Sequence, residues 1–321
     1  MNRFEWVSAT SVDTAIDEMR SGAVAKAGGV DLLDRLKEGI EQPGRLVNIR
    51  TISGLDFIEE NGDGLRLGPN VTMAAVGDSK VIRKRWPALS DAASAAATPQ
   101  IRNMATIGGN ILQRPRCWYF RSSDFHCLRK GGGECFAIDG ENEFHAIFDN
   151  DVCAIVHPSA AAVPLTAYEA VLEIDGPNGK RDLPIEQLYV RPEENVEKEH
   201  VLGAGEIIVA IRVPLPANGA RSAYVKQGQK KSFDWPLADA AVVLGMDGNV
   251  VREASIVLGA AAPVPWRAKK AEEFLSGKRL DEATAREAGR RAMDGATPLG
   301  NNSYKLTMFP AVIGRALMAA R

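Results

Sequence analysis

The chain of 321 residues is longer than one hydrophobic core usually serves, which predicts two or three domains. Its 45% hydrophobic and 25% charged residues are typical of a globular protein, and a net charge of −2 argues against a dedicated nucleic-acid binder. No apolar run reaches the roughly 18 residues that a membrane-spanning helix needs. Residues 1–6 also lack the apolar centre of a signal peptide, so we expect a cytoplasmic chain, or a periplasmic one if a signal-bearing partner exports it.

The first fifty residues predict a strand at 4–7, a helix that Ser11 can cap, and a buried strand at 23–27. The buried strand leads into a pair of glycines and then into an amphipathic helix. Its apolar face should carry Leu32, Leu33 and Leu36. A glycine turn between a strand and a helix can bind a phosphate, because glycine allows close approach and the first helical N–H groups are free. A single pair of adjacent glycines more often marks an ordinary tight turn than a phosphate site. The pattern also matches neither a Rossmann nor a Walker motif.

A second glycine turn ends the next stretch of the chain. Before it, the sequence predicts strands at 46–49 and 65–68, a helix capped by Thr72, and an alanine-rich helix at 87–97. The pair Gly108 and Gly109 is again a weak signal when taken alone. Together, the two turns suggest one extended ligand that backbone amides from separate loops would hold.

All four cysteines of the chain follow shortly after this turn: Cys117, Cys127, Cys135 and Cys153. Disulfides suit small secreted proteins, and isolated buried thiols should be scattered, so their clustering favours metal binding. The segment contains no C-x2-C pair, which weakens a zinc site without excluding it, and a thiolate-bound cluster is the alternative. His126 and His145 are possible further ligands, although hydrogen-bonded histidines are commoner. Residues 112–152 show little periodicity, and bound metal would explain how so long a loop is ordered.

The remainder predicts a helix at 160–171, a strand at 171–174 and an alternating strand at 206–214, followed by a linker at 214–218. Beyond the linker we expect three antiparallel strands and then helices. The strands are predicted at 222–226, 240–244 and 254–258, and the helices at about 267–276, 281–293 and 309–320. This last part contains no recognisable catalytic triad or acid pair.

Several of these motifs resemble those of one family, the FAD-binding medium subunits of molybdenum hydroxylases, which include xanthine dehydrogenase and carbon monoxide dehydrogenase. The resemblance covers essentially the whole chain. It rests on A-G-G-V-D-L-L at 27–33 and T-I-G-G-N at 106–110, with further matches at 100–103, 259–267 and 301–305.

The resemblance implies an α+β fold made of two domains. Residues 1–218 would form a two-part FAD-binding domain of the vanillyl-alcohol-oxidase (PCMH) type, with subdomains at about 1–55 and 56–218. Residues 219–321 would form a C-terminal domain with a three-stranded antiparallel sheet and helices. The implied cofactor-binding residues are Ala27, Gly28, Gly29, Val30, Asp31, Leu32, Thr106, Ile107, Gly108, Gly109, Asn110 and Ser159.

The cysteine segment is similar to an insert, here at about 112–156, in the FAD subunits of periplasmic aldehyde oxidoreductase and 4-hydroxybenzoyl-CoA reductase. That likeness implies that the four cysteines hold a [4Fe–4S] cluster. Two residues depart from the family pattern. Val30 stands where a hydroxyl or imidazole is frequent, and Ala160 stands where an aspartate is usual. Both changes remove a side-chain contact to the flavin, whereas binding through backbone amides would survive them.

The implied function is electron transfer through FAD to an acceptor within a heterotrimer. A large subunit would carry the molybdenum cofactor and a small subunit two [2Fe–2S] clusters. No general base or nucleophile is needed in this chain, because the flavin does the chemistry. One alternative is a non-catalytic, metal-stabilised assembly protein that has lost FAD. Another is a stand-alone flavin oxidase, which would need a catalytic set that residues 219–321 do not display.

Overall fold

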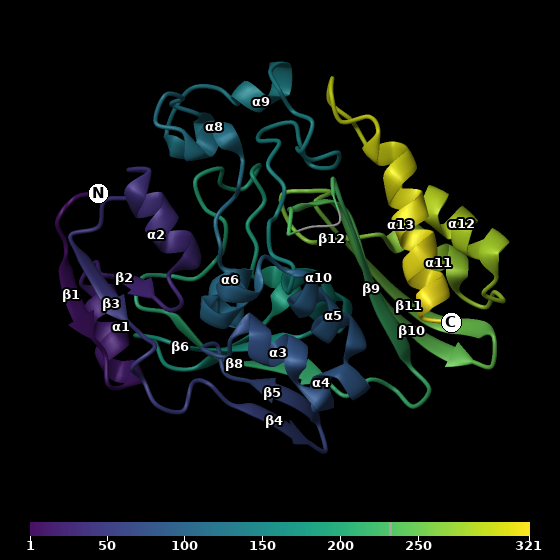
Figure 1. Cartoon of the computed structure of the whole chain (residues 1–321), viewed down its shortest axis with the longest axis horizontal. Coiled ribbons are helices and arrows are strands. Elements are labelled where there is room, and N and C mark those ends of the chain that lie inside the picture. The colour runs from purple at the N-terminus through teal and green to yellow at the C-terminus, as the bar shows by residue number, and fades with distance from the viewer. Residues whose placement is uncertain (231–232) are drawn as a thin grey trace.

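The computed structural model describes residues 1–230 and 233–321. In this part of the chain the strands form three sheets, with helices between and outside them (Figure 1). The predicted α+β class is confirmed. None of the helices in the described ranges combines the length and the apolarity that crossing a membrane requires.

The N-terminal unit is a small parallel sheet in the order β1-β3-β2 with two connecting helices. Its elements are β1 (Glu5–Ser8), α1 (Val12–Arg20), β2 (Val24–Lys26), α2 (Val30–Lys37) and β3 (Arg45–Asn48). Ser11 caps α1 as predicted, because its hydroxyl accepts a hydrogen bond from the backbone N of Thr14. Leu32 and Leu36 are buried on the inner face of α2, whereas Leu33 is exposed, so the predicted apolar face was one residue too wide.

The central unit is a five-stranded antiparallel sheet in the order β4-β5-β8-β6-β7. Its strands are β4 (Ile58–Asn61), β5 (Gly64–Leu67), β6 (Val171–Asp175), β7 (Arg181–Pro184) and β8 (Ile207–Pro214). Short helices lie against it: α3 (Met73–Asp78), α4 (Lys80–Arg85), α5 (Pro87–Ala95), α6 (Pro99–Met104), α7 (Ile107–Ile111), α10 (Ala162–Ala167) and the 3-10 turn η2 (Ile185–Gln187). Trp86 is fully buried between these layers, and its indole N–H donates to the Pro214 carbonyl at 2.9 Å.

Two features of this unit differ from the prediction. Strands β4 and β7 were not predicted, because both lie at the edges of the sheet and most of their side chains are exposed or half-buried, which weakens the apolar alternation. The helix predicted at 160–171 is shorter, since Glu169 adopts a left-handed conformation with φ of 57° and turns the chain into β6.

The C-terminal unit is a four-stranded antiparallel sheet in the order β12-β11-β10-β9, with three helices after it. Its elements are β9 (Arg221–Gly228), β10 (Pro236–Asp247), β11 (Val250–Gly259), β12 (Trp266–Arg267), α11 (Lys269–Leu275), α12 (Glu282–Arg291) and α13 (Lys305–Ala319). All three predicted strands are present. The fourth, β12, has only two residues, which is too short for a periodic signal.

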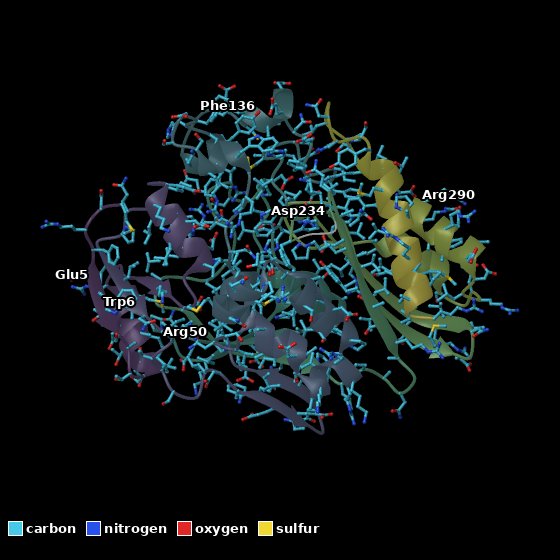
Figure 2. The ribbon with its side chains drawn as sticks, viewed as in Figure 1. Glu5, Trp6, Arg50, Phe136, Asp234 and Arg290 are labelled. Carbon is cyan, nitrogen blue, oxygen red and sulfur yellow. The ribbon has the colours of Figure 1, made fainter. Side chains whose placement is uncertain are left out.

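The cysteine segment forms a cap above the junction of the three units (Figure 1). Its regular structure is limited to α8 (Trp118–Arg121), the 3-10 turn η1 (Leu128–Lys130) and α9 (Phe136–Asp139). Phe136 marks the outer end of this cap in Figure 2, whereas Asp234 lies near the middle of the molecule. The small amount of regular structure agrees with the weak periodicity of the sequence.

One buried lysine ties this cap to the last helix. Lys305 has no exposed surface, and its ammonium group donates to the carbonyls of Phe144 at 3.3 Å, His145 at 2.9 Å and Ala260 at 2.8 Å. Burial lowers the pKa of Lys305 to about 7. The three carbonyls satisfy all three donors of the ammonium group, which is the condition for burying it.

We expect Lys305→Ala to lower the free energy of unfolding by about 3 kcal/mol, because three buried carbonyls lose their donor and a cavity is left. Urea titration of both proteins measures the difference. Lys270→Ala removes a lysine whose side chain is 63% exposed, and it should change stability by less than about 0.5 kcal/mol. Equal effects of the two substitutions would contradict the role given to Lys305.

Candidate functional site

A cavity of about 460 Å³ lies between the three units of the fold. The start of α2, the loop before α6, the second glycine turn and the strands β9 and β10 all contribute to its wall. Ten of the twelve predicted cofactor-binding residues line it: Ala27, Gly28, Gly29, Val30, Asp31, Leu32, Thr106, Gly108, Gly109 and Asn110. The other two, Ile107 and Ser159, do not. The fold therefore brings both glycine turns to one place. We call this space the large cavity.

The first glycine turn positions the beginning of helix α2 at the cavity. A side chain at Gly28 would place its Cβ 2.1 Å from the Met104 carbonyl oxygen, so the chain needs glycine there. Gly29 precedes the helix with φ of 79°. In the described ranges the backbone N–H groups of Val30, Asp31 and Leu32 have no acceptor. These free first-turn amides at a helix N-terminus are suited to a phosphate.

The second glycine turn is built differently from our expectation. We predicted that its amides would be available to a ligand, but Gly108 donates its N–H to the Pro69 carbonyl at 2.9 Å, and Ile107 donates to the Val71 carbonyl at 2.8 Å. The Gly109 N–H donates to the Thr106 hydroxyl at 3.2 Å, which caps the short helix α7. These amides hold the turn in place, because a five-residue helix needs its own first-turn donors satisfied.

Glycine at position 109 still leaves the cavity wall open. A Cβ there would contact only the Thr106 hydroxyl, at 3.1 Å, so the protein by itself tolerates a small side chain. The lack of a side chain therefore allows a bound group to approach the backbone. Ser159 does not line the cavity, but it contacts a residue that does. Its hydroxyl donates to the Asn110 side-chain oxygen at 2.7 Å and so holds the Asn110 amide at the cavity.

Further polar groups at the cavity were missed by the sequence analysis. Arg102, Arg116 and Lys226 line it, and so does Tyr224, whose hydroxyl donates to Asp239 at 2.8 Å. Burial raises the pKa of Asp239 to about 6. These residues come from different elements and show no common spacing, so nothing in the sequence pattern distinguishes them from surface cations.

The four cysteines line a second, small cavity of about 10 Å³ within the cap. The neighbouring Cys153 side chain lowers the pKa of Cys135 to about 6, and Cys135 together with burial raises the pKa of Cys153. Burial raises the pKa of Cys117 to about 11. Among the residues that the structure describes, no three His, Cys, Asp or Glu side chains are grouped as a single metal ion requires. A cubane cluster takes its four thiolates on four separate irons, and its ligands therefore lie farther apart than those of one ion.

Two other side chains complete the surroundings of the cysteines. His145 is buried and its Nε2 lies 3.2 Å from the sulfur of Cys117, so it is a hydrogen-bond partner of that thiol. Burial also lowers the pKa of His145 to about 4, which keeps its ring neutral. Arg129 is buried beside Cys153 and pairs with Glu199 at 3.0 Å. Four converging thiols with a buried cation fit an anionic thiolate cluster. His126 does not line this cavity.

A third cavity of about 270 Å³ adjoins both sites. It shares Arg116, Pro158 and Trp235 with the large cavity, and Cys117 and His145 with the cysteine cavity. The predicted flavin site and the predicted metal site are therefore neighbours in the fold, linked through the residues that this third cavity shares with each.

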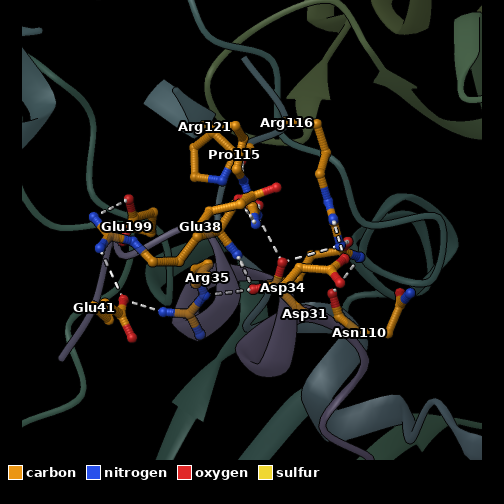
Figure 3. A network of polar contacts seen from close by, with 12 residues as sticks. Asp31, Asp34, Arg35, Glu38, Glu41, Asn110, Pro115, Arg116, Arg121 and Glu199 are labelled. Atoms are coloured by element: carbon orange, nitrogen blue, oxygen red, sulfur yellow. Dashed lines mark hydrogen bonds and ion pairs between the residues drawn. The ribbon is translucent and has the colours of Figure 1, made fainter. Parts of the chain in front are cut away.

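An ionic network centred on Asp31 connects the cap to helix α2 (Figure 3). The Asp31 carboxylate lies 3.0 Å from Arg35, 3.0 Å from Arg116 and 2.6 Å from Arg121, and it also accepts from the backbone N of Arg114 at 3.1 Å. Burial alone would raise the pKa of Asp31, but the neighbouring guanidinium groups, first of all Arg116, outweigh it and hold the pKa below its ordinary value. Arg114, Arg116 and Arg121 all belong to the cysteine segment, so one carboxylate anchors that segment to the first glycine turn.

Comparison with known proteins identifies the family. Residues 2–216 match the model of the FAD binding domain in molybdopterin dehydrogenase, and residues 223–320 match the CO dehydrogenase flavoprotein C-terminal domain. The chain belongs to the FAD-binding medium subunits of the molybdenum hydroxylase and CO dehydrogenase family. The resemblance seen in its two glycine motifs is thereby confirmed at the level of the family.

Individual members of the family align over nearly the full length of the chain. The aldehyde oxidoreductase FAD-binding subunit PaoB of Escherichia coli is 32% identical, with 97% of this chain and 96% of that protein covered. The carbon monoxide dehydrogenase medium chain of Hydrogenophaga pseudoflava is 30% identical over 99% and 97% of the two chains. A solved structure of carbon monoxide dehydrogenase from that organism superposes with a TM-score of 0.78 at 29% identity, covering 99% of this chain and 97% of the other.

We expect Asp31→Asn to lower the free energy of unfolding at pH 7 by about 3 kcal/mol, because a half-buried carboxylate that holds three guanidinium groups is removed. A carboxyl whose pKa is lowered by folding stabilises the protein above its unfolded pKa of about 3.9, and this contribution is lost as the pH falls through the folded value. The difference between wild type and variant should thus be constant from pH 7 to about pH 5 and shrink below about pH 4.

Urea titrations at a series of pH values measure this difference. Asp34→Asn is a matched control on the same helix, since the Asp34 side chain is 50% exposed and its contact with Arg116 is 3.7 Å long. It should change stability by less than about 1 kcal/mol. Equal losses in the two variants, or a difference that is unchanged down to pH 2, would refute the role of Asp31.

Proposed function

We propose that this chain is the FAD-binding electron-transfer subunit of a heterotrimeric molybdenum hydroxylase of the aldehyde or xanthine dehydrogenase kind. The observation that carries the proposal is the large cavity of a chain that matches the family over nearly its whole length. Its wall contains both the N–H groups of Val30, Asp31 and Leu32, which have no acceptor among the described residues, and the side-chain-free position 109. The partners would be a large subunit with the molybdenum cofactor and a small subunit with two [2Fe–2S] clusters.

FAD, when bound, supplies the exchange of electrons between iron–sulfur clusters and an acceptor. The chain's own part is to bind and orient the cofactor. Residues 27–32 would contact its phosphates through backbone amides, residues 106–110 would form the opposite wall, and Ser159 would act indirectly by fixing Asn110. Val30 and Ala160 also line the cavity, and their apolar side chains add no polar contact.

The division of the chain at 218/219 belongs to the same proposal. Residues 1–218 would be the FAD-binding domain, with subdomains at about 1–55 and 56–218, and residues 219–321 the C-terminal domain. The change from the central to the C-terminal sheet between β8 and β9 supports that boundary. The compartment, predicted as cytoplasmic unless a partner exports the chain, stays a prediction.

We further propose that residues at about 112–156 hold a [4Fe–4S] cluster through Cys117, Cys127, Cys135 and Cys153. Two observations support it. The four thiols line one cavity, and Arg129 supplies a buried positive charge beside Cys153. The likeness to an aldehyde oxidoreductase FAD-binding subunit is in keeping with this assignment.

Substitution of Gly109 tests the flavin proposal. The purified protein should show a flavin absorbance spectrum, and Gly109→Val should lose most of the flavin because a branched side chain closes the approach to the backbone. Gly44→Val, at a glycine with open space around its Cβ and outside the cavity, should keep the full flavin content. Full flavin in the Gly109 variant would refute this wall of the site. A wild-type protein without flavin would instead favour the alternative of an assembly protein that has lost FAD.

Metal analysis tests the cluster proposal. Protein prepared without oxygen should contain about four iron and about four sulfide ions per chain, as a four-cysteine [4Fe–4S] site requires. Cys135→Ser should lower the iron content and make residues 112–152 more sensitive to protease, whereas the neighbouring exposed substitution Glu134→Gln should change neither. One zinc without sulfide, or full iron in the Cys135 variant, is the result that would overturn the proposal.

A further inference from the structure

The side chain of Arg116 extends from the cysteine segment to the wall of the large cavity. It lines that cavity beside the beginning of helix α2, and its Nη2 lies 3.0 Å from the Asp31 carboxylate. The guanidinium group lies over the Trp235 ring, 4.8 Å from its centre. Arg116 therefore comes from one candidate site and contributes to the other.

The Arg116 side chain is held in place, but not all of its N–H donors have an acceptor among the described residues. Its exposed fraction is 23%, and a second contact, 3.3 Å from Nη2 to the Gln113 side-chain oxygen, fixes the guanidinium group. Its buried Nε–H has no partner in the described chain, and the 3.7 Å separation from Asp34 is too long for a good hydrogen bond. Arginine carries five N–H donors, so this residue retains donors for a ligand.

The carboxylate nearest to Arg116 is shared with other guanidinium groups. Asp31 is bound by Arg35 and Arg121 as closely as by Arg116, so it is not committed to Arg116 alone. The Arg116 guanidinium group lies at the same cavity wall as the free first-turn amides of α2, and a cation next to a helix N-terminus is the combination that binds phosphate groups.

We propose that Arg116 is a direct phosphate ligand of the dinucleotide cofactor and binds its pyrophosphate together with the amides of Val30, Asp31 and Leu32. This inference rests on the proposed function, since it presumes that the cavity takes FAD. Arg116 supplies the side-chain contact that Val30 cannot make. Since Arg116 is adjacent to Cys117, the cysteine segment takes part in holding the flavin.

The test compares two flavins that differ in their phosphates. Full-length protein stripped of flavin is titrated with FAD and with riboflavin, which has the same ring but no phosphate. Arg116→Gln should weaken FAD binding about 10- to 100-fold, the size of one charge-assisted hydrogen bond, and change riboflavin binding less than about twofold. Arg116→Lys, which keeps the charge, should fall between wild type and Arg116→Gln. FAD binding should also depend less on salt in the glutamine variant.

Arg121→Gln is the matched control, because Arg121 pairs with the same Asp31 carboxylate and does not line the cavity. It should leave the ratio of FAD to riboflavin affinity unchanged. Unaltered FAD binding in Arg116→Gln, or equal losses for both flavins, would refute the inference while leaving the flavin site intact. A wild-type protein that binds neither flavin would overturn the proposed function, and this inference with it. Thermal unfolding midpoints of all four proteins show whether a loss of binding reflects a loss of fold.

Discussion

The structure depends above all on one half-buried carboxylate, that of Asp31. The short helices of the cap bury little apolar surface, so polar contacts add to the packing that orders it. Asp31 compensates by binding three guanidinium groups, two of which the cap supplies, and one backbone amide. Removing one partner of such a half-buried group costs more than a surface ion pair would, so the network holds the cap in one orientation. The same residue lies in the first turn of α2, which places the glycine turn and the cap in a fixed relation.

The C-terminal unit holds the cap from the other side. Lys305, at the start of α13, donates to the carbonyls of Phe144, His145 and Ala260, and Asn302 donates to the His145 carbonyl at 3.2 Å. The contacts with Phe144 and His145 join residues about 160 positions apart in the chain. The large cavity therefore lies between parts that are each anchored independently. A site for a cofactor that exchanges electrons benefits from such rigidity, because its groups do not need to rearrange around the bound flavin.

The two glycine turns illustrate how similar motifs serve different purposes. At the first, the leading amides of the helix after the turn have no acceptor among the described residues, and they lie at the wall of the large cavity. At the second, the amides donate hydrogen bonds to the carbonyls of Pro69 and Val71 and to the Thr106 hydroxyl. Glycine is needed there because the lack of a side chain leaves space at the cavity wall. Sequence alone cannot separate the two cases, since both consist of a glycine pair before a helix. The difference arises from neighbouring loops that accept or do not accept the N–H groups.

The sequence by itself determined the α+β class, most strands and helices, the grouping of the cysteines and the family, because periodicity, capping residues and short glycine motifs are local signals. It did not predict the edge strands β4 and β7 or the two-residue β12, whose local pattern is too weak or too short. Only the tertiary structure decided that Arg116 and Lys226 line the cavity and that Ser159 contacts it indirectly, through Asn110. It also decided that Asp31 of α2 binds several residues of the cap. These assignments depend on distances between residues far apart in the chain, and no local pattern encodes such distances.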